Sequence, residues 1–124
     1  WPCGCGRAGC IECYISGPGL TRLAEHAGHG PIAPEAAAQT AAALDLWADL
    51  AGETLAMAQV MFDPQVIVLG GGLSKLPEAA ARLSAALEAH RLRGAARPQI
   101  RLARHGDSSG ARGAAMLARD GLIC

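Results

Sequence analysis

Apolar residues recur every three or four positions in several stretches of the chain, and this spacing predicts helices. The longest stretch is Glu35–Phe62, which stops at Asp63-Pro64. Its expected apolar face consists of Leu44, Trp47, Ala51, Leu55, Ala58 and Phe62. Shorter helices are expected over 12–26, interrupted at 16–19 and resuming at Leu20, and over 76–90, where Ser74 is the expected N-cap. A small-residue helix is expected to follow Asp107–Gly110 and to end near Arg119, with Asp107 or a serine as its cap.

Two short apolar runs predict strands instead, because they are short, rich in β-branched residues and bounded by glycine or proline. Val66–Leu69 precedes a triple glycine and is typical of a buried parallel strand. Ile100–Ala103 follows a loop at Gly94–Pro98 and is the second expected strand. Helices and strands that alternate in this way predict an α/β fold with parallel strands and crossover helices.

Composition narrows the class of protein. The 124 residues suffice for one domain, and 11 basic against 11 acidic residues leave no excess charge that would attract a nucleic acid. The apolar runs are too short for a bilayer span and no signal peptide is evident, so we expect a cytoplasmic location and no membrane partner. Four of the five cysteines crowd one end, far from Cys124, which favours a metal site over a disulfide framework.

The first thirteen residues carry the most specific chemistry in the sequence. Cys3, Cys5, Cys10 and Cys13 follow the spacing C-x-C-x4-C-x2-C, and the glycines between them permit a tight loop. Zinc takes four nitrogen or sulfur ligands, so these cysteines could form a complete four-cysteine site. The alternative of inert thiols is disfavoured, because four free thiols in one loop would be reactive.

A triple glycine, Gly70–Gly72, follows the first expected strand. At the carboxyl end of a parallel strand such a turn lets a ligand approach the backbone, and it is moderately typical of nucleotide contact. A turn with a purely structural role remains an open alternative. The segment 104–110 combines His, Asp and Ser, but residues so close in sequence do not generally form a catalytic triad, and we expect a strand end and a helix start there.

Together these motifs resemble the ROK family (repressors, open reading frames and sugar kinases). The cysteine loop resembles the family's C-x-C-G-x-x-G-C-x-E signature, and the resemblance continues through 14–20, 63–74 and 104–115, over nearly the whole chain. The last two stretches look most like bacterial fructokinases of the manno(fructo)kinase type. The resemblance implies the actin-like ATPase (ribonuclease H-like) fold of two α/β lobes. Residues 1–124 would then be the C-terminal lobe, with a zinc loop at 1–13 and an α/β part at 14–124, and the N-terminal lobe would be absent.

The resemblance also implies roles for individual residues. A structural zinc would be bound by Cys3, Cys5 and Cys10 together with a histidine upstream of this chain. Glu12 would contact sugar hydroxyls, and the adenosine of ATP, which binds with Mg2+, would contact Gly70, Gly71 and Gly72. Cys13 lies outside the family signature. We expect it to lie near the zinc while the upstream histidine is the native fourth ligand, although in the isolated chain Cys13 could substitute for it.

The activity that the resemblance implies is ATP-dependent phosphorylation of a hexose such as fructose, by an enzyme that is a homodimer in its full-length form. The family's phosphate loop and catalytic Asp are not in these residues, so we expect no catalytic residue here and no kinase activity from the 124-residue chain. A sugar-responsive repressor of the same family is the alternative, and nucleic acid would be a partner only there. A stand-alone zinc module that binds a protein would explain the first thirteen residues alone.

Overall fold

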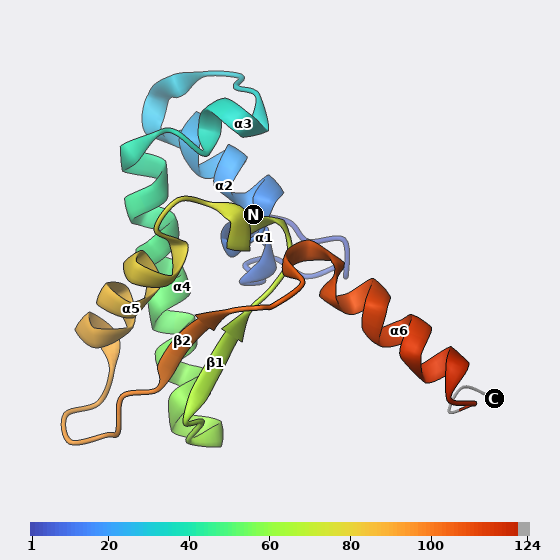
Figure 1. Cartoon of the computed structure of the whole chain (residues 1–124). Helices are drawn as coiled ribbons and strands as arrows, with labels where there is room; N and C mark the ends of the chain where they lie inside the picture. The colour runs from blue at the N-terminus through green and yellow to red at the C-terminus, as the bar shows by residue number, and fades with distance from the viewer. Residues whose placement is uncertain (122–124) are drawn as a thin grey trace.

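The computed structural model describes residues 1–121, and Cys124 lies outside this part. A cysteine loop leads into a helical layer, and a small parallel sheet follows with α6 beyond it (Figure 1). The helices are α1 (Glu12–Ile15), α2 (Gly17–Ala24), α3 (Pro34–Ala37), α4 (Ala41–Phe62), α5 (Ala79–His90) and α6 (Ser109–Arg119). The strands are β1 (Val66–Leu69) and β2 (Gln99–Leu102), and short turns of other helix types are η1 (Glu25–His29), η2 (Gly72–Lys75) and η3 (Gly106–Ser108).

The sheet confirms the expected α/β organisation. β1 and β2 pair in parallel, in a register that runs from Val66 opposite Gln99 to Leu69 opposite Leu102, and α5 is the crossover between them. β2 begins one residue earlier than expected. The expectation of a buried first strand is wrong, because Val66 and Val68 are 42% and 61% exposed. Among the described residues, helices cover only the other face of the sheet, to which Leu69 contributes.

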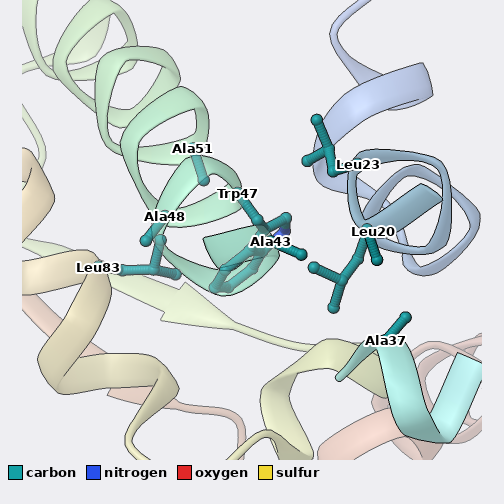
Figure 2. Close-up of a cluster of buried hydrophobic side chains, with 9 residues drawn as sticks. Leu20, Leu23, Ala37, Ala43, Trp47, Ala48, Ala51 and Leu83 are labelled. Atoms are coloured by element: carbon teal, nitrogen blue, oxygen red, sulfur yellow. The ribbon is translucent and has the colours of Figure 1, made fainter. Parts of the chain in front are cut away.

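The hydrophobic core lies between α2, α4 and α5, and its side chains converge on Trp47 (Figure 2). Trp47 is 3% exposed and packs among leucines and alanines, the residue types that let helices approach closely. Its indole N–H donates a hydrogen bond of 2.8 Å to the carbonyl oxygen of Ile15, at the end of α1. The expected apolar face of the long helix is therefore confirmed at its centre. It is wrong at its end, where Phe62 is 73% exposed.

Helix boundaries differ from the prediction at two places in the first half of the chain. α2 begins at Gly17 and not at Leu20, because the Ser16 hydroxyl caps it by accepting a hydrogen bond of 3.2 Å from the Gly19 N–H. Pro18 sits in the first turn, where its missing N–H leaves no helical bond unmade. The stretch expected as one helix over 35–62 is two helices, with a break between Ala37 and Ala41.

The expected cap of α5 is wrong, and that of α6 is confirmed in its position alone. Ser74 is buried in η2 and donates a hydrogen bond of 2.7 Å to the carbonyl of Gly71. α5 starts later, at Ala79, since Pro77 disfavours a helical conformation of the residue before it. At α6 the N-cap position is Ser108, whose side chain makes no capping bond, and Asp107 lies in η3. No residue of α6 is buried, and the helix projects from the body of the molecule (Figure 1).

Within residues 1–121, none of the helices combines the length and the apolar character that crossing a bilayer requires.

We predict that Gly52→Ala destabilises the fold. A Cβ at Gly52 on α4 would lie 2.5 Å from the Cβ of Ala86 and 2.7 Å from its backbone carbon on α5. Overpacking of this kind typically costs about 1–3 kcal/mol. Because the clash involves backbone atoms of α5, the cost should lie at the upper end of this range. It should therefore exceed the roughly 1 kcal/mol by which alanine's higher helix propensity stabilises α4. Urea unfolding followed by circular dichroism measures the free energy of unfolding.

Gly110→Ala is the matched control, because a Cβ there meets nothing within 4 Å. It should leave stability unchanged or raise it by up to about 1 kcal/mol. A Gly52→Ala variant as stable as the original chain would contradict the close approach of α4 and α5.

Candidate functional site

The cysteine loop folds back on itself through backbone hydrogen bonds. An antiparallel bridge joins Pro2 to Ala8, and the Cys3 N–H donates a hydrogen bond of 2.7 Å to the carbonyl of Arg7. Gly6 and Gly9 have φ values of +84° and +77°, which residues with a Cβ rarely adopt. These turns bring together cysteines that are up to seven residues apart in sequence.

Three of the four sulfurs in the loop form a compact group. The Sγ atoms of Cys3, Cys5 and Cys10 all lie within 4.8 Å of one another, and those of Cys5 and Cys10 are 3.5 Å apart. The four described cysteines are free thiols. A tetrahedron of Zn–S bonds has edges of about 3.8 Å, so the spacing of the three sulfurs is close to what zinc requires.

The pKa values of these thiols show how strongly the sulfurs interact. Hydrogen bonds from the backbone N–H of Cys5, and then from neighbouring thiols, lower the pKa of Cys3 to about 7. The thiol of Cys5, followed by that of Cys3, raises the pKa of Cys10 to about 12. One thiolate is therefore favoured in the group and further ones are opposed. A divalent cation would supply the positive charge that lets all three sulfurs ionise.

Glu12 is the first residue of α1 and is exposed beside the cysteine loop. It lines a cavity of about 370 Å³, together with Cys3, Cys5 and Arg22. A carboxylate in such a position can accept two hydrogen bonds from neighbouring sugar hydroxyls. The structure thus places Glu12 in a cavity that two of the three clustered cysteines also line, and its contact with sugar stays a prediction.

The triple glycine forms the turn between β1 and η2. Gly71 has a φ of +79°, so a side chain at this position would be strained. Gly70, Gly71 and Gly72 line a cavity of about 400 Å³, whose other walls are mainly apolar and include Trp47 and Leu55. An apolar cavity with exposed backbone at one end suits a flat ring such as a nucleotide base. That Gly70–Gly72 contact adenosine stays a prediction.

The two cavities meet at the start of α2. Ser16 lines both of them, and Gly17 lines the cavity of the triple glycine. The sequence pattern contained no sign of this, because it indicated only an interruption of the helix at 16–19. The structure therefore connects the predicted sugar-side and nucleotide-side cavities through one residue at the start of a helix.

Lys75 and Asp107 form a pair that the sequence analysis missed. The Lys75 Nζ lies 2.7 Å from the Asp107 Oδ2, so η2 after β1 is tied to η3 after β2. This hydrogen bond, and next the charge of Lys75, hold the pKa of Asp107 below its usual value. The topology could have indicated the pair, because both residues follow parallel strands, whose carboxyl ends lie at one edge of the sheet.

The sequence model of the ROK family matches residues 1–121, and the chain belongs to this family. It is 43% identical over 123 residues to the N-acetyl-D-glucosamine kinase of Escherichia coli O9:H4 (strain HS), covering 93% of this chain and 41% of that enzyme. The N-acetyl-D-glucosamine kinase of Shigella flexneri is 42% identical over the same length. The chain thus spans about two fifths of the curated relatives that it matches.

Two solved structures share the fold. The ROK hexokinase from Thermus thermophilus superposes with a TM-score of 0.74 at 32% identity, over 94% of this chain and 43% of that one. A ROK family glucokinase from Streptomyces griseus, in complex with glucose and AMPPNP, superposes with a TM-score of 0.81 at 28% identity, over 96% and 47%. The expected actin-like ATPase fold is confirmed.

We predict that Lys75→Ala raises the pKa of Asp107 toward its ordinary value, because the ammonium group that stabilises the carboxylate is gone. Since the folded pKa of Asp107 is depressed, its contribution to stability is present above the ordinary aspartate pKa and is lost as the pH falls through the folded pKa. NMR titration of the Asp107 carboxyl carbon measures the shift. Lys75→Arg, which keeps the positive charge, should leave the pKa of Asp107 nearly as low as in the original chain. An unchanged pKa in Lys75→Ala would contradict the ion pair.

Proposed function

We propose that this chain is the C-terminal lobe of an ATP-dependent sugar kinase, with a zinc loop at 1–13 and an α/β part at 14–124. The observation that carries the proposal is the meeting of two cavities at Ser16, one beside Glu12 and one beside the triple glycine. A kinase needs its two substrates in adjacent sites. The printed names of the relatives, N-acetyl-D-glucosamine kinase, hexokinase and glucokinase, support the same class of reaction.

In this proposal each part of the chain has a binding role. Glu12 accepts hydrogen bonds from sugar hydroxyls, and its carboxylate discriminates between hydroxyl geometries because both oxygens must be satisfied. Gly70–Gly72 let the adenosine of ATP approach the backbone, and the apolar wall around Trp47 excludes water from that side. Cys3, Cys5 and Cys10 hold the zinc, which stabilises the loop that leads into Glu12.

The reacting groups would come from the other lobe. On the resemblance to the family, we propose that the base that deprotonates the sugar hydroxyl, and the loop that holds the phosphates with Mg2+, belong to that lobe. On the same resemblance we propose a cytoplasmic homodimer for the full-length protein. The described residues supply one wall of the substrate cleft.

Two proposals compete for the identity of the sugar that is phosphorylated. Sequence resemblance favours fructose, whereas the names of relatives that are 42–43% identical favour N-acetyl-D-glucosamine. We propose N-acetyl-D-glucosamine, or an aldohexose such as glucose, ahead of fructose. Glucose is the sugar in the Streptomyces griseus complex, and N-acetyl-D-glucosamine is a derivative of it.

The test is ATP-dependent ADP release by the full-length gene product, measured with N-acetyl-D-glucosamine, glucose, mannose and fructose in turn. We expect turnover with at least one of these sugars. Glu12→Ala should lower kcat/KM by about tenfold or more, because a hydrogen bond to a charged group contributes about 1.5–3 kcal/mol. Glu53→Ala, which removes an exposed carboxylate from α4, is the matched control and should leave kcat/KM unchanged. Sugar binding without turnover, together with binding to DNA, would move the protein to the repressor class.

A second prediction concerns the 124-residue chain by itself. Because the proposed base and phosphate loop lie in the other lobe, we expect the purified chain to release no ADP above the rate without enzyme, whichever sugar is added. A coupled ADP assay at high protein concentration measures this. Sugar-dependent turnover by the purified chain would contradict the proposal that the base and the phosphate loop lie in the other lobe.

A further inference from the structure

The turn after β2 packs beside the triple-glycine turn after β1. The N–H of Ala103, directly after β2, donates a hydrogen bond of 2.8 Å to the carbonyl of Leu69, so the pairing extends one residue past the end of β2. A Cβ at Gly70 would lie 3.8 Å from the Cβ of Ala103 and 3.9 Å from the carbonyl oxygen of Gly106. The segment 103–106 therefore lies against the first residue of the triple glycine.

An ion pair joins the two turns a few residues further on. Lys75 is the last residue of η2 and Asp107 lies in η3, and 2.7 Å separate the Lys75 Nζ from the Asp107 Oδ2. The residues of η2 before Lys75, Gly72 to Ser74, line the cavity of the triple glycine. The pair therefore anchors the end of a segment that forms a wall of this cavity.

A second set of contacts holds the turn from within. Ser74 is buried, and both its hydroxyl and its N–H donate hydrogen bonds to the carbonyl of Gly71, at 2.7 and 3.2 Å. These bonds fix Ser74 relative to Gly71, but they do not tie η2 to the rest of the molecule. Of the contacts described above, the ion pair of Lys75 with Asp107 does so through side chains.

We propose that Lys75 and Asp107 are positioning residues of the nucleotide site, and that their ion pair holds the triple-glycine turn in the conformation to which adenosine binds. The inference rests on the proposed function, because it assumes that this cavity takes the nucleotide. Glycine loses more conformational freedom on ordering than any other residue, and the turn has three in succession. A turn that is ordered before binding spares the ligand that entropy cost.

Nucleotide binding by the full-length gene product tests the proposal, with ADP as the probe in isothermal titration calorimetry. Lys75→Ala and Asp107→Asn each break the ion pair, and we expect each to weaken ADP binding about two- to fivefold. The effect is small because both side chains are exposed, at 65% and 48%, and exposed pairs contribute little. Lys75→Arg, which keeps the charge, should bind ADP nearly as tightly as the original protein. Binding of glucose and N-acetyl-D-glucosamine should stay unchanged in all three variants.

The two disruptive variants distinguish positioning from direct contact with phosphate. If Lys75 bound the phosphates of ADP itself, Asp107→Asn would free the lysine and remove a negative charge, so that ADP would bind more tightly. Positioning predicts weaker binding in both variants, although they change the net charge in opposite directions. Tighter binding of ADP by Asp107→Asn would overturn the proposal.

Arg119→Ala is the matched control for the loss of one positive charge. It breaks a similarly exposed ion pair, Arg119 with Asp120 at 2.8 Å, which joins neighbours in the sequence and ties no two turns together. It should leave ADP binding unchanged. Equal effects of Arg119→Ala and Lys75→Ala, or an unchanged affinity in Lys75→Ala, would overturn the inference and leave the proposed function intact. If the original protein binds sugar but neither ADP nor ATP, the proposed function fails, and the inference fails with it.

Discussion

The buried indole of Trp47 is the contact on which the arrangement of both candidate cavities depends. Its ring fills the space between α2, α4 and α5, and its N–H satisfies the carbonyl of Ile15 at the end of α1. α1 carries Glu12 and follows directly on the cysteine loop, while the same indole lines the cavity of the triple glycine. Large aromatic side chains contribute several kcal/mol to a core, about 3–5 when truncated to alanine. One side chain thus fixes the distance between the two predicted binding regions.

Close packing contributes more than charge to the contact between α4 and α5. α4 and α5 cross at Gly52 and Ala86, where no larger side chain fits, and alanines fill most of the surrounding core. Polar contacts join the same two helices at their rims: an ion pair of Arg82 with Asp45 at 2.7 Å and a hydrogen bond between His90 and Asp49 at 2.6 Å. Their carboxylates are largely exposed, and exposed pairs of this kind contribute little, about 0–1 kcal/mol.

The order of elements and the parallel strands could be predicted from the sequence. A short β-branched run that ends at a triple glycine favours a strand followed by a turn over a helix. Prediction from the sequence failed where burial depends on a packing partner, and where two local signals compete for a helix start. Val66 and Val68 have strand propensity, but their burial depends on what covers that face of the sheet. Ser74 is a good capping residue, yet Pro77 moved the helix start beyond its reach. Such competition between local signals cannot be weighed from propensities alone.

At the candidate sites, spacing predicted that the four cysteines of the loop would converge, since the glycines between them permit a tight loop. The structure brings three of them together, Cys3, Cys5 and Cys10, which are the three that the resemblance implied. The ion pair of Lys75 with Asp107 was not predicted, because 32 residues separate its members and only the sheet brings them together. The roles of Glu12 and of Gly70–Gly72 stay predictions drawn from resemblance, now with cavities of suitable size beside them.

Ser16 is a shared wall between those cavities, and this has a consequence for how ligands would affect one another. Its hydroxyl caps α2, so Ser16 cannot shift without disturbing the first turn of that helix. A molecule that displaces Ser16 from one side changes the shape of the cavity on the other side. Thermodynamic linkage makes such an effect mutual: if the first ligand strengthens or weakens binding of the second, the second does the same to the first by an equal factor. A capping serine would then transmit cooperativity between two binding sites.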